Sequence, residues 1–256
     1  MSSMKTNSKG KNNYLITGTS NGLGKYLHDN LGGISFVRSD AKDERAEIII
    51  HCAFNSEHNP KDLDQYFKDN VFLTGKLTKI SHGKFIFISS VDVYPKDSKK
   101  HLEDEIININ EIDGLYGVTK LMSEHLVKNN CPNFLILRCT ALIGKDSRKN
   151  SLIRVIEEDN LALTLSEKSV FNYILHSDVL KFIKLAIKKD LKGVYNLASS
   201  KNITLKEVTN LFKKRVKFGN YIYNVGNIDN DKASNFFPDF KKTSKEIISE
   251  FGSSIF

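Results

Sequence analysis

The 256-residue chain is predicted to adopt an α/β fold, a Rossmann-like doubly wound parallel sheet with a small C-terminal lobe. Two observations predict this fold. Short apolar runs typical of buried strands alternate with segments of helical periodicity. A glycine-rich turn, Thr17 to Gly24, stands between the first apolar run and the first helical segment. Strands that alternate with helices imply right-handed crossovers and therefore a parallel sheet.

The individual elements follow from these two periodicities. Strands are predicted at residues 14–17, 34–37, 48–52, 84–89, 134–137 and 194–197. Helices are predicted at residues 23–31, 62–81, 115–128, 178–189, 204–214 and 243–251. The helix that follows Thr204 begins with a capping-box pattern, because Glu207 stands three residues later. The pattern loosens after Gly144, which indicates a different organisation in the second half.

The composition excludes several classes of protein. Hydrophobic residues make up 40% of the chain, which is too many for general disorder. No apolar run reaches the length of about 18 residues that a membrane-spanning helix needs. The polar N-terminus does not resemble a secretory signal, and residues 1–12 are interpreted as a disordered leader.

The net charge of +8 does not predict a nucleic-acid groove. Residues 13–200 carry 25 basic and 24 acidic side chains, so the excess lies in the leader and in the C-terminal part. A dispersed lysine excess is typical of a solvated surface. The three cysteines form no pair with metal or disulfide spacing, which favours reduced thiols in a cytoplasmic protein and no metal site.

The glycine turn predicts a dinucleotide-binding site. Gly18 allows the tight turn, Gly22 lets the backbone approach a pyrophosphate, and Gly24 lets the helix pack closely on the strand. The helix N-terminus then offers free N–H groups to the phosphates. The cofactor-binding residues predicted here are Gly18, Ser20, Asn21, Gly22, Leu23 and Gly24.

Arg38 bears on the choice between NAD and NADP. A dinucleotide site usually has an acidic residue about 20 positions after the first glycine, at the end of the next strand. Arg38 stands there instead, and an arginine can bind a 2′-phosphate with two hydrogen bonds, so NADP is favoured over NAD. The alternative is an exposed strand-end arginine, with Asp40 or Asp43 contacting the ribose.

Tyr116 and Lys120 predict an oxidoreductase site. They lie one helical turn apart on one face of a predicted helix, which follows a buried strand that ends in Ser89 and Ser90. A nearby cation favours the phenolate of a tyrosine, whose unperturbed pKa is about 10. Ser90 can hold a substrate oxygen while Tyr116 exchanges a proton with it and hydride moves to or from a nicotinamide. Lys120 can also contact the nicotinamide ribose.

These motifs resemble the short-chain dehydrogenase/reductase superfamily, in its extended branch of nucleotide-sugar epimerases, dehydratases and reductases. The similarity is spread over nearly the whole chain after residue 13. It implies that Cys52 and Ala53 lie beside the cofactor, that Asn70 steadies the active site, and that Ser90 is the active-site serine. The segments that carry it are Ile50–Ala53, Asn70–Val71, Ser89–Tyr94, Leu137–Gly144, Asn172–Val179 and Gly193–Ala198.

Several departures from the family pattern concern the substrate. Phe171 stands where the family often has an arginine that grips the nucleotide diphosphate. Only nine residues separate Arg38 from Ile48, so a helix–strand unit on the adenine side is shortened or missing. Val91 replaces the general acid of the family's dehydratases, which excludes a 4,6-dehydratase. Asp92 takes the place of the acid/base cysteine of the GDP-fucose synthase group, and is either a proton-transfer group or an exposed loop acid.

The resemblance implies an NAD(P)-dependent epimerase or reductase acting on a sugar, with a nucleotide-linked sugar favoured. The alternatives are a catalytically idle dinucleotide sensor or scaffold, and a reductase of a small carbonyl without a nucleotide. A homodimer through the helices that bear Asn70 and Tyr116 is a further implication of the resemblance.

His51 is interpreted as a hydrogen-bonded core residue, with a catalytic role as the alternative, whereas His82, His101 and His125 are expected at the surface. Residues 13–144 would form the dinucleotide-binding domain, and residues 145–256 a substrate lobe interleaved with the sheet.

Overall fold

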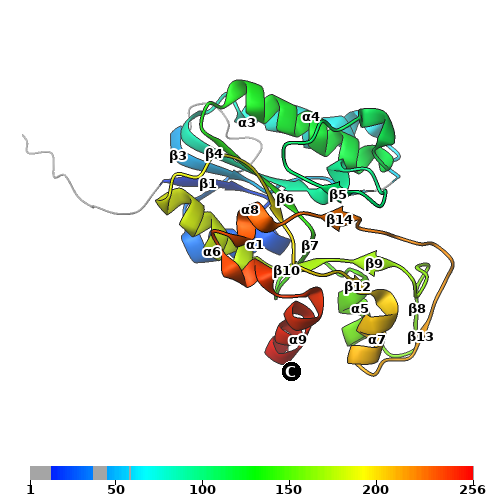
Figure 1. Ribbon diagram of the computed structural model, residues 1–256. Coiled ribbons are helices and arrows are strands. Elements are labelled where there is room, and N and C mark those ends of the chain that lie inside the picture. Colours follow the sequence, from blue (N-terminus) through cyan, green and yellow to red (C-terminus); the bar gives the residue numbers. More distant parts are fainter. Residues whose placement is uncertain (1–12, 37–44, 58, 256) are drawn as a thin grey trace, which may run out of the picture.

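A computed structural model describes residues 13–36, 45–57 and 59–255, with side chains up to residue 253. The predicted leader and Arg38 lie outside the described residues. The centre is a parallel sheet of six strands in the order β2-β1-β3-β4-β6-β11 (Figure 1). These strands are β1 (Tyr14–Thr17), β2 (Ile34–Ser35), β3 (Arg45–His51), β4 (Ser81–Ser90), β6 (Phe134–Cys139) and β11 (Gly193–Leu197). The predicted doubly wound parallel sheet is therefore confirmed.

Helices cover both faces of the sheet, because alternate side chains of each strand point to opposite sides. On one face, apolar side chains of α1 and α6 pack on the strands, and on the other those of α3 and α4 do so (Figure 1). The helices are α1 (Gly22–Leu31), α2 (Leu63–Phe67), α3 (Leu73–Leu77), α4 (Gly114–Asn130), α5 (Ser151–Glu157), α6 (His176–Lys188), α7 (Leu205–Leu211), α8 (Asp231–Ser234) and α9 (Ser244–Ile255). A π-helix, η1 (Lys68–Phe72), joins α2 to α3, and 3-10 turns are η2 (Val91–Val93), η3 (Ile109–Glu111) and η4 (Pro238–Lys241).

The strand order places a crevice next to the glycine turn. The chain leaves β1 toward β2 on one side and returns to β3 on the other, so the order reverses between β1 and β3. Ligands of open parallel sheets bind at such a reversal, beyond the carboxyl ends of the strands. Among the described residues, β2 is the one strand beyond β1, which agrees with the predicted shortening on the adenine side.

The second half of the chain contributes both to the sheet and to a separate lobe. Strand β11 and helix α6 belong to the central layers, while α5, α7 and α9 pack around a second apolar cluster (Figure 1). Short two-stranded sheets connect the parts: β7 (Ala141–Ile143) with β10 (Tyr173–Leu175), β9 (Val170–Phe171) with β12 (Ile203–Thr204), β8 (Leu161–Ala162) with β13 (Val216–Lys217), and β5 (Lys100–His101) with β14 (Asn227–Ile228). Within the described part of the chain, every helix is too short or too polar to cross a bilayer.

Two elements differ from the sequence-based predictions. The helix predicted at residues 62–81 contains the π-helical turn η1 and ends at Leu77, since β4 begins at Ser81. The helix predicted to run to residue 214 ends at Leu211, because Lys213 takes a left-handed conformation with φ of 52°. The capping box of Thr204 and Glu207 is present as predicted.

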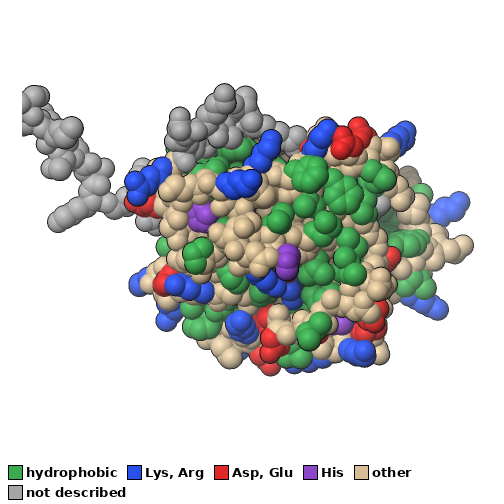
Figure 2. Space-filling view, turned by 90° about the horizontal axis from the view of Figure 1, so that it is seen from above, with side chains coloured by type: hydrophobic (Ala, Val, Ile, Leu, Met, Phe, Trp, Pro, Cys, Tyr) green, Lys and Arg blue, Asp and Glu red, His purple; other side chains and the backbone are tan. Residues whose placement is uncertain are grey.

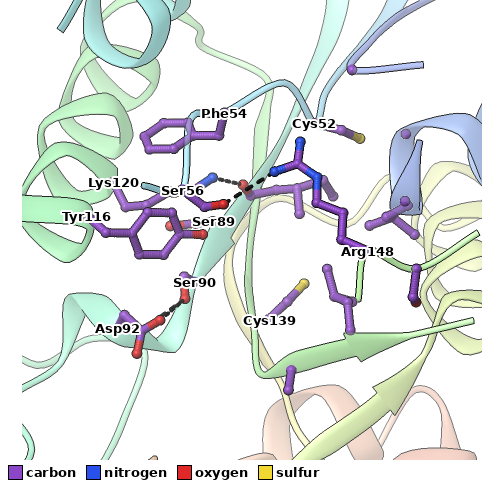
Figure 3. A pocket seen from close by; sticks show the side chains of 18 of the residues that line it. Cys52, Phe54, Ser56, Ser89, Ser90, Asp92, Tyr116, Lys120, Cys139 and Arg148 are labelled. Atoms are coloured by element: carbon purple, nitrogen blue, oxygen red, sulfur yellow. Dashed lines mark hydrogen bonds between the residues drawn. The ribbon is translucent and has the colours of Figure 1, made fainter. Parts of the chain in front are cut away.

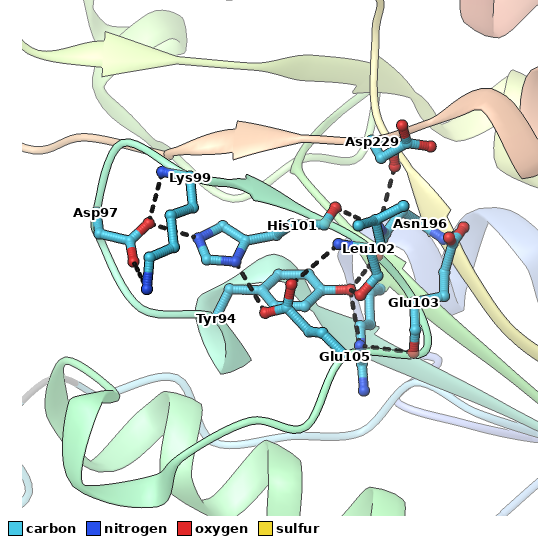
Figure 4. A network of polar contacts seen from close by, with 10 residues as sticks. Tyr94, Asp97, Lys99, His101, Leu102, Glu103, Glu105, Asn196 and Asp229 are labelled. Carbon is cyan, nitrogen blue, oxygen red and sulfur yellow. Dashed lines mark hydrogen bonds and ion pairs between the residues drawn. The ribbon is translucent and has the colours of Figure 1, made fainter.

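His101 is buried, which corrects its predicted surface position. Its side chain stacks on the ring of Tyr94 with centroids 4.9 Å apart, and its Nδ1 lies 2.8 Å from the Glu105 carboxylate (Figure 4). The loop after η2 folds back over Tyr94, and β14 pairs with β5 across it. A histidine in a polar sequence is thus buried by contacts with a strand more than 100 residues away.

Candidate active site

A cavity of about 650 Å³ opens at the carboxyl ends of the central strands (Figure 3). It is called the first cavity below. Nearly all of the predicted site residues line it: Gly18, Ser20, Asn21, Gly22, Leu23, Gly24, Cys52, Ala53, Ser89, Ser90, Asp92, Tyr116 and Lys120. Asn70 does not line the cavity, but it is hydrogen-bonded to Asn55, which does. Residues from the ends of three strands, β1, β3 and β4, and from the start of α4 are therefore brought together by the fold.

The glycines of the turn are required by close backbone contacts. A Cβ at Gly24 would lie 2.3 Å from the carbonyl oxygen of Gly18, so only glycine lets α1 pack against the end of β1. Gly18 has φ of 72°, and its Cβ would lie 2.8 Å from the amide nitrogen of Ala53. These contacts hold the first turn of α1 at the edge of the first cavity. The N–H groups and dipole of a helix N-terminus favour phosphate, so the arrangement fits a dinucleotide.

His51 has a structural place, in agreement with the core alternative. It is fully buried, with Nδ1 2.8 Å from Thr17 Oγ1 and Nε2 3.0 Å from Thr74 Oγ1. Thr17 Oγ1 accepts hydrogen bonds from the amides of Cys52 and Ala53, so its own proton is donated to Nδ1. The single N–H proton of the neutral ring is therefore on Nε2, which donates to Thr74 Oγ1. Burial lowers the pKa of His51 to about 3, so the ring stays neutral. The histidine ties β1, β3 and α3 together beneath the cavity.

Asn70 fixes the loop that follows β3. Its Oδ1 accepts a hydrogen bond from the amide of Asn55 at 2.7 Å, and its Nδ2 donates to the Asn55 carbonyl at 3.0 Å. The Asn70 carbonyl accepts from Thr74 Oγ1, so the loop is linked to the His51 contacts. The π-helical turn that contains Asn70 is of a kind found often at functional sites. This geometry supports the predicted steadying role.

Tyr116 and Lys120 project from the first turns of α4 into the first cavity (Figure 3). The Lys120 ammonium donates to the Ile88 carbonyl at 2.6 Å and lies 3.7 Å from the centre of the Phe54 ring. The same ring meets Tyr116 edge to face, with centroids 5.7 Å apart. Phe54 therefore sets the spacing between the two side chains, and it was not identified from the sequence.

Ser90 and Asp92 line the first cavity on the same side as Tyr116 (Figure 3). The Ser90 hydroxyl donates to Asp92 Oδ2 at 3.0 Å and accepts from the Asp92 amide at 3.1 Å. Asp92 Oδ1 accepts from Lys96 at 2.7 Å and from the Tyr223 hydroxyl at 3.3 Å. Asp92 is thus held inside the site and is not an exposed loop acid. Ser89 points away from the cavity centre and donates to Glu124 at 2.7 Å.

Burial and charge shift the ionisation of these groups. Burial lowers the pKa of Lys120 to about 7. Burial, and then the Asp92 carboxylate, raise the pKa of Tyr116 above its usual value. Burial opposes ionisation of Asp92, but the Lys96 ammonium and the hydrogen bonds from Ser90 and Tyr223 together outweigh it and lower the pKa of Asp92. At neutral pH the tyrosine therefore carries its proton and the aspartate is charged.

A second cavity of about 630 Å³ lies beyond Tyr116 and shares Asp92, Tyr116, Phe171 and Tyr223 with the first. Its lining includes four aromatic side chains. Phe171 stacks on Tyr223 with ring centroids 4.9 Å apart, and Tyr221 adds a further exposed ring. Phe171, which stands where the family often has an arginine, thus lines both cavities and lies where they meet.

The lining residues of the first cavity that carried no sequence motif include Phe54, Arg148 and Tyr223. Phe54 directly follows Cys52 and Ala53, so the end of β3 was the signal that could have found it. Tyr223 belongs to an irregular stretch and reaches Asp92 across 131 positions, and Arg148 reaches Asn21 across 127. Such long-range contacts have no local sequence signal.

The chain belongs to the NAD dependent epimerase/dehydratase family, whose model matches residues 30–198, about two thirds of its length. The family resemblance drawn from the motifs is therefore confirmed. So is the prediction of an NAD(P)-dependent enzyme of the epimerase or reductase kind. A search of curated protein sequences finds no match.

Solved structures with the same fold include enzymes of sugar metabolism. MoeE5 in complex with UDP-glucuronic acid and NAD has a TM-score of 0.78 at 17% identity, covering 95% of this chain and 100% of that one. UDP-glucuronic acid 4-epimerase from Bacillus cereus, in complex with UDP-glucuronic acid and NAD, has a TM-score of 0.74 at 20% identity, with coverage of 95% and 100%. dTDP-4-dehydrorhamnose reductase from Bacillus anthracis, in complex with NADP, has a TM-score of 0.79 at 19% identity, with coverage of 96% and 100%. At these identities the likeness concerns the fold.

Proposed function

We propose that the protein transfers hydride between NAD(P) and a hydroxyl-bearing carbon of a sugar, as an epimerase or a reductase. The observation that carries the proposal is that Ser90, Tyr116 and Lys120 meet on the wall of the cavity that the glycine turn borders. The ligands named for the structural neighbours, UDP-glucuronic acid with NAD and a bound NADP, support a nucleotide-linked sugar and either cofactor. Arg38 favours NADP, on sequence grounds alone.

Each of the three residues has a role that its surroundings support. The nicotinamide, when bound, supplies or accepts the hydride. Ser90 orients the substrate oxygen when its hydroxyl, which donates to Asp92 in the structure, turns to donate to that oxygen. Tyr116, which keeps its proton at neutral pH, donates it to a carbonyl oxygen as the carbon receives hydride. Lys120 stabilises the phenolate that results, and Phe54 holds the ammonium in place.

The lobe of residues 145–256 is proposed to select the substrate, because Phe171 and Tyr223 close the second cavity. A carbonyl compound without a nucleotide is the second candidate substrate. It is favoured by the aromatic stack of Phe171 on Tyr223, where the family pattern has a phosphate-binding arginine. Saturation-transfer NMR with nucleotide sugars, free sugars and simple ketones separates the two candidates.

Millimolar NADPH should raise the melting temperature of the purified protein. A ligand at 100 times its Kd adds about 2.7 kcal/mol to the stability, which corresponds to roughly 5–10 °C for a chain of this size. NADPH should give a larger shift than NADH if Arg38 binds the 2′-phosphate, and Arg38→Ala should remove the difference. No shift with either cofactor would contradict the proposed function.

A homodimer is proposed to form through the helical face of α2, η1, α3 and α4. Exposed apolar side chains on these elements include Leu63, Phe72 and Met122, and hydrophobic side chains gather in the view onto this face (Figure 2). Light scattering should give a dimer mass, and Phe72→Glu should shift it to the monomer. Ile106→Glu, at a fully exposed loop position, should leave the mass unchanged.

A cytoplasmic location is also proposed, because the three cysteines are free.

A further inference from the structure

A segment of the second half of the chain lies directly on the glycine turn. Residues 144–150, here called the strap, follow β7 and lead to α5. The amide of Gly22 donates to the Asp146 carbonyl at 2.7 Å, and the Asp146 carboxylate pairs with Lys25 at 3.1 Å. Gly22 opens α1, so one of the N–H groups expected to face a phosphate is already paired with a carbonyl of the strap.

Arg148 extends from the strap across the first cavity (Figure 3). Its Nε donates to Asn21 Oδ1 at 3.0 Å, and its Nη1 donates to Ser56 Oγ at 3.3 Å. Asn21 stands at the start of α1 and Ser56 in the loop after β3, so the guanidinium bridges the two sides of the crevice. Both partners are neutral, and within the described ranges Arg148 has no carboxylate partner. Its charge and its remaining N–H donors are left for a ligand.

We propose that Arg148 binds a diphosphate in the first cavity, and that this diphosphate is the pyrophosphate of the dinucleotide cofactor. This inference rests on the proposed function. A guanidinium pairs with phosphate oxygens through two parallel hydrogen bonds and stays charged at any working pH. The position of Arg148 next to Asn21, at the N-terminus of α1, matches the place where the glycine turn presents a pyrophosphate.

The other charged groups of the cavity already have partners. The Lys120 ammonium bonds to the Ile88 carbonyl, and the Asp92 carboxylate pairs with Lys96. The Asp69 carboxylate accepts from Asn55 and Gln65. The Ser147 hydroxyl, next to Arg148, is buried in the cavity lining without a hydrogen-bond partner among the described residues. A bound pyrophosphate would replace the Asp146 carbonyl at the Gly22 amide. The strap would then hold the cofactor through Arg148 where it now holds the glycine turn through Asp146.

The test is titration calorimetry with NADPH, NADH, ADP-ribose and adenosine on the full chain. ADP-ribose keeps the diphosphate without the nicotinamide, and adenosine lacks phosphate. Arg148→Gln should bind ADP-ribose at least about tenfold more weakly than the wild type, the cost of one charged hydrogen-bonded contact. Arg148→Lys should recover part of the lost ADP-ribose affinity, because it keeps the positive charge. The affinity for adenosine, which makes no phosphate contact, should stay within about twofold of the wild type in each variant.

Arg154→Gln is the matched control, because Arg154 pairs with Glu158 outside both cavities and should leave every affinity unchanged. Equal ADP-ribose affinity in Arg148→Gln and wild type would overturn the inference while leaving the proposed function intact. Weakened binding of UDP with unchanged binding of ADP-ribose would also overturn it, by assigning Arg148 to a substrate diphosphate. A wild type that binds no dinucleotide would overturn the proposed function as well.

Discussion

Replacing Tyr116 with phenylalanine should lower turnover by about 10²- to 10⁴-fold and leave cofactor affinity within about twofold of the wild type. The phenol lies in the same cavity as Ser90, and its raised pKa means that it keeps its proton at neutral pH. The ring itself packs against Phe54 and keeps that contact in the variant. Steady-state rates with the substrate found by NMR, together with calorimetry for the cofactor, measure the two effects separately.

Tyr26→Phe provides the matched control for this experiment. Tyr26 lies on α1, outside the linings of both cavities, and loses the same hydroxyl group. Its rate should stay within about twofold of the wild type. Comparable turnover in Tyr116→Phe and Tyr26→Phe would remove Tyr116 from the reaction. A loss of cofactor binding in Tyr116→Phe would instead assign it to the binding site alone.

The layers of the fold were predictable because each element carries its own periodicity. Apolar runs such as the one ending at His51 form buried strands, and the glycine turn has a geometry that only glycine satisfies at Gly24. The short linker after Arg38 also predicted a shortened or missing helix–strand unit beside β1, where the described residues contain one strand, β2. These features depend on residues close together in the sequence. The π-helical turn around Asn70 was not predictable, because the Asn70 side chain is hydrogen-bonded to Asn55, which lies in another segment.

The candidate site was predictable to a similar extent and for the same reason. Ser90, Tyr116 and Lys120 stand next to recognisable strand and helix ends, so their meeting follows from the parallel sheet. Asp92 could not be placed, since the groups that hold it inside the cavity include Tyr223, which lies in a stretch without a motif. Arg148 was overlooked for the same reason. Contacts between the two halves of the chain decide these positions.

A buried polar network supports the strand that carries Ser90. Glu124 of α4 is fully buried and accepts from Ser89 and, through two nitrogens, from Arg138 of β6. Arg138 Nη1 donates to the Tyr94 hydroxyl at 2.7 Å. This hydroxyl in turn donates to Asn196 of β11 (Figure 4). Taking two charges out of water is costly, and their pairing with these hydrogen bonds offsets that cost. The network therefore fixes β4 relative to β6 and α4.

Glu124→Ala should lower the free energy of unfolding by about 3–5 kcal/mol, because it leaves the Arg138 charge buried without its partner. Urea unfolding measures the change. The double variant Glu124→Leu with Arg138→Met should recover much of the loss, since it removes both charges and fills similar volume. Glu158→Ala, which breaks the half-exposed pair with Arg154, should cost less than about 1 kcal/mol. A loss in Glu124→Ala no larger than in Glu158→Ala would show that water reaches the buried pair, and that the position of Ser90 depends on apolar packing alone.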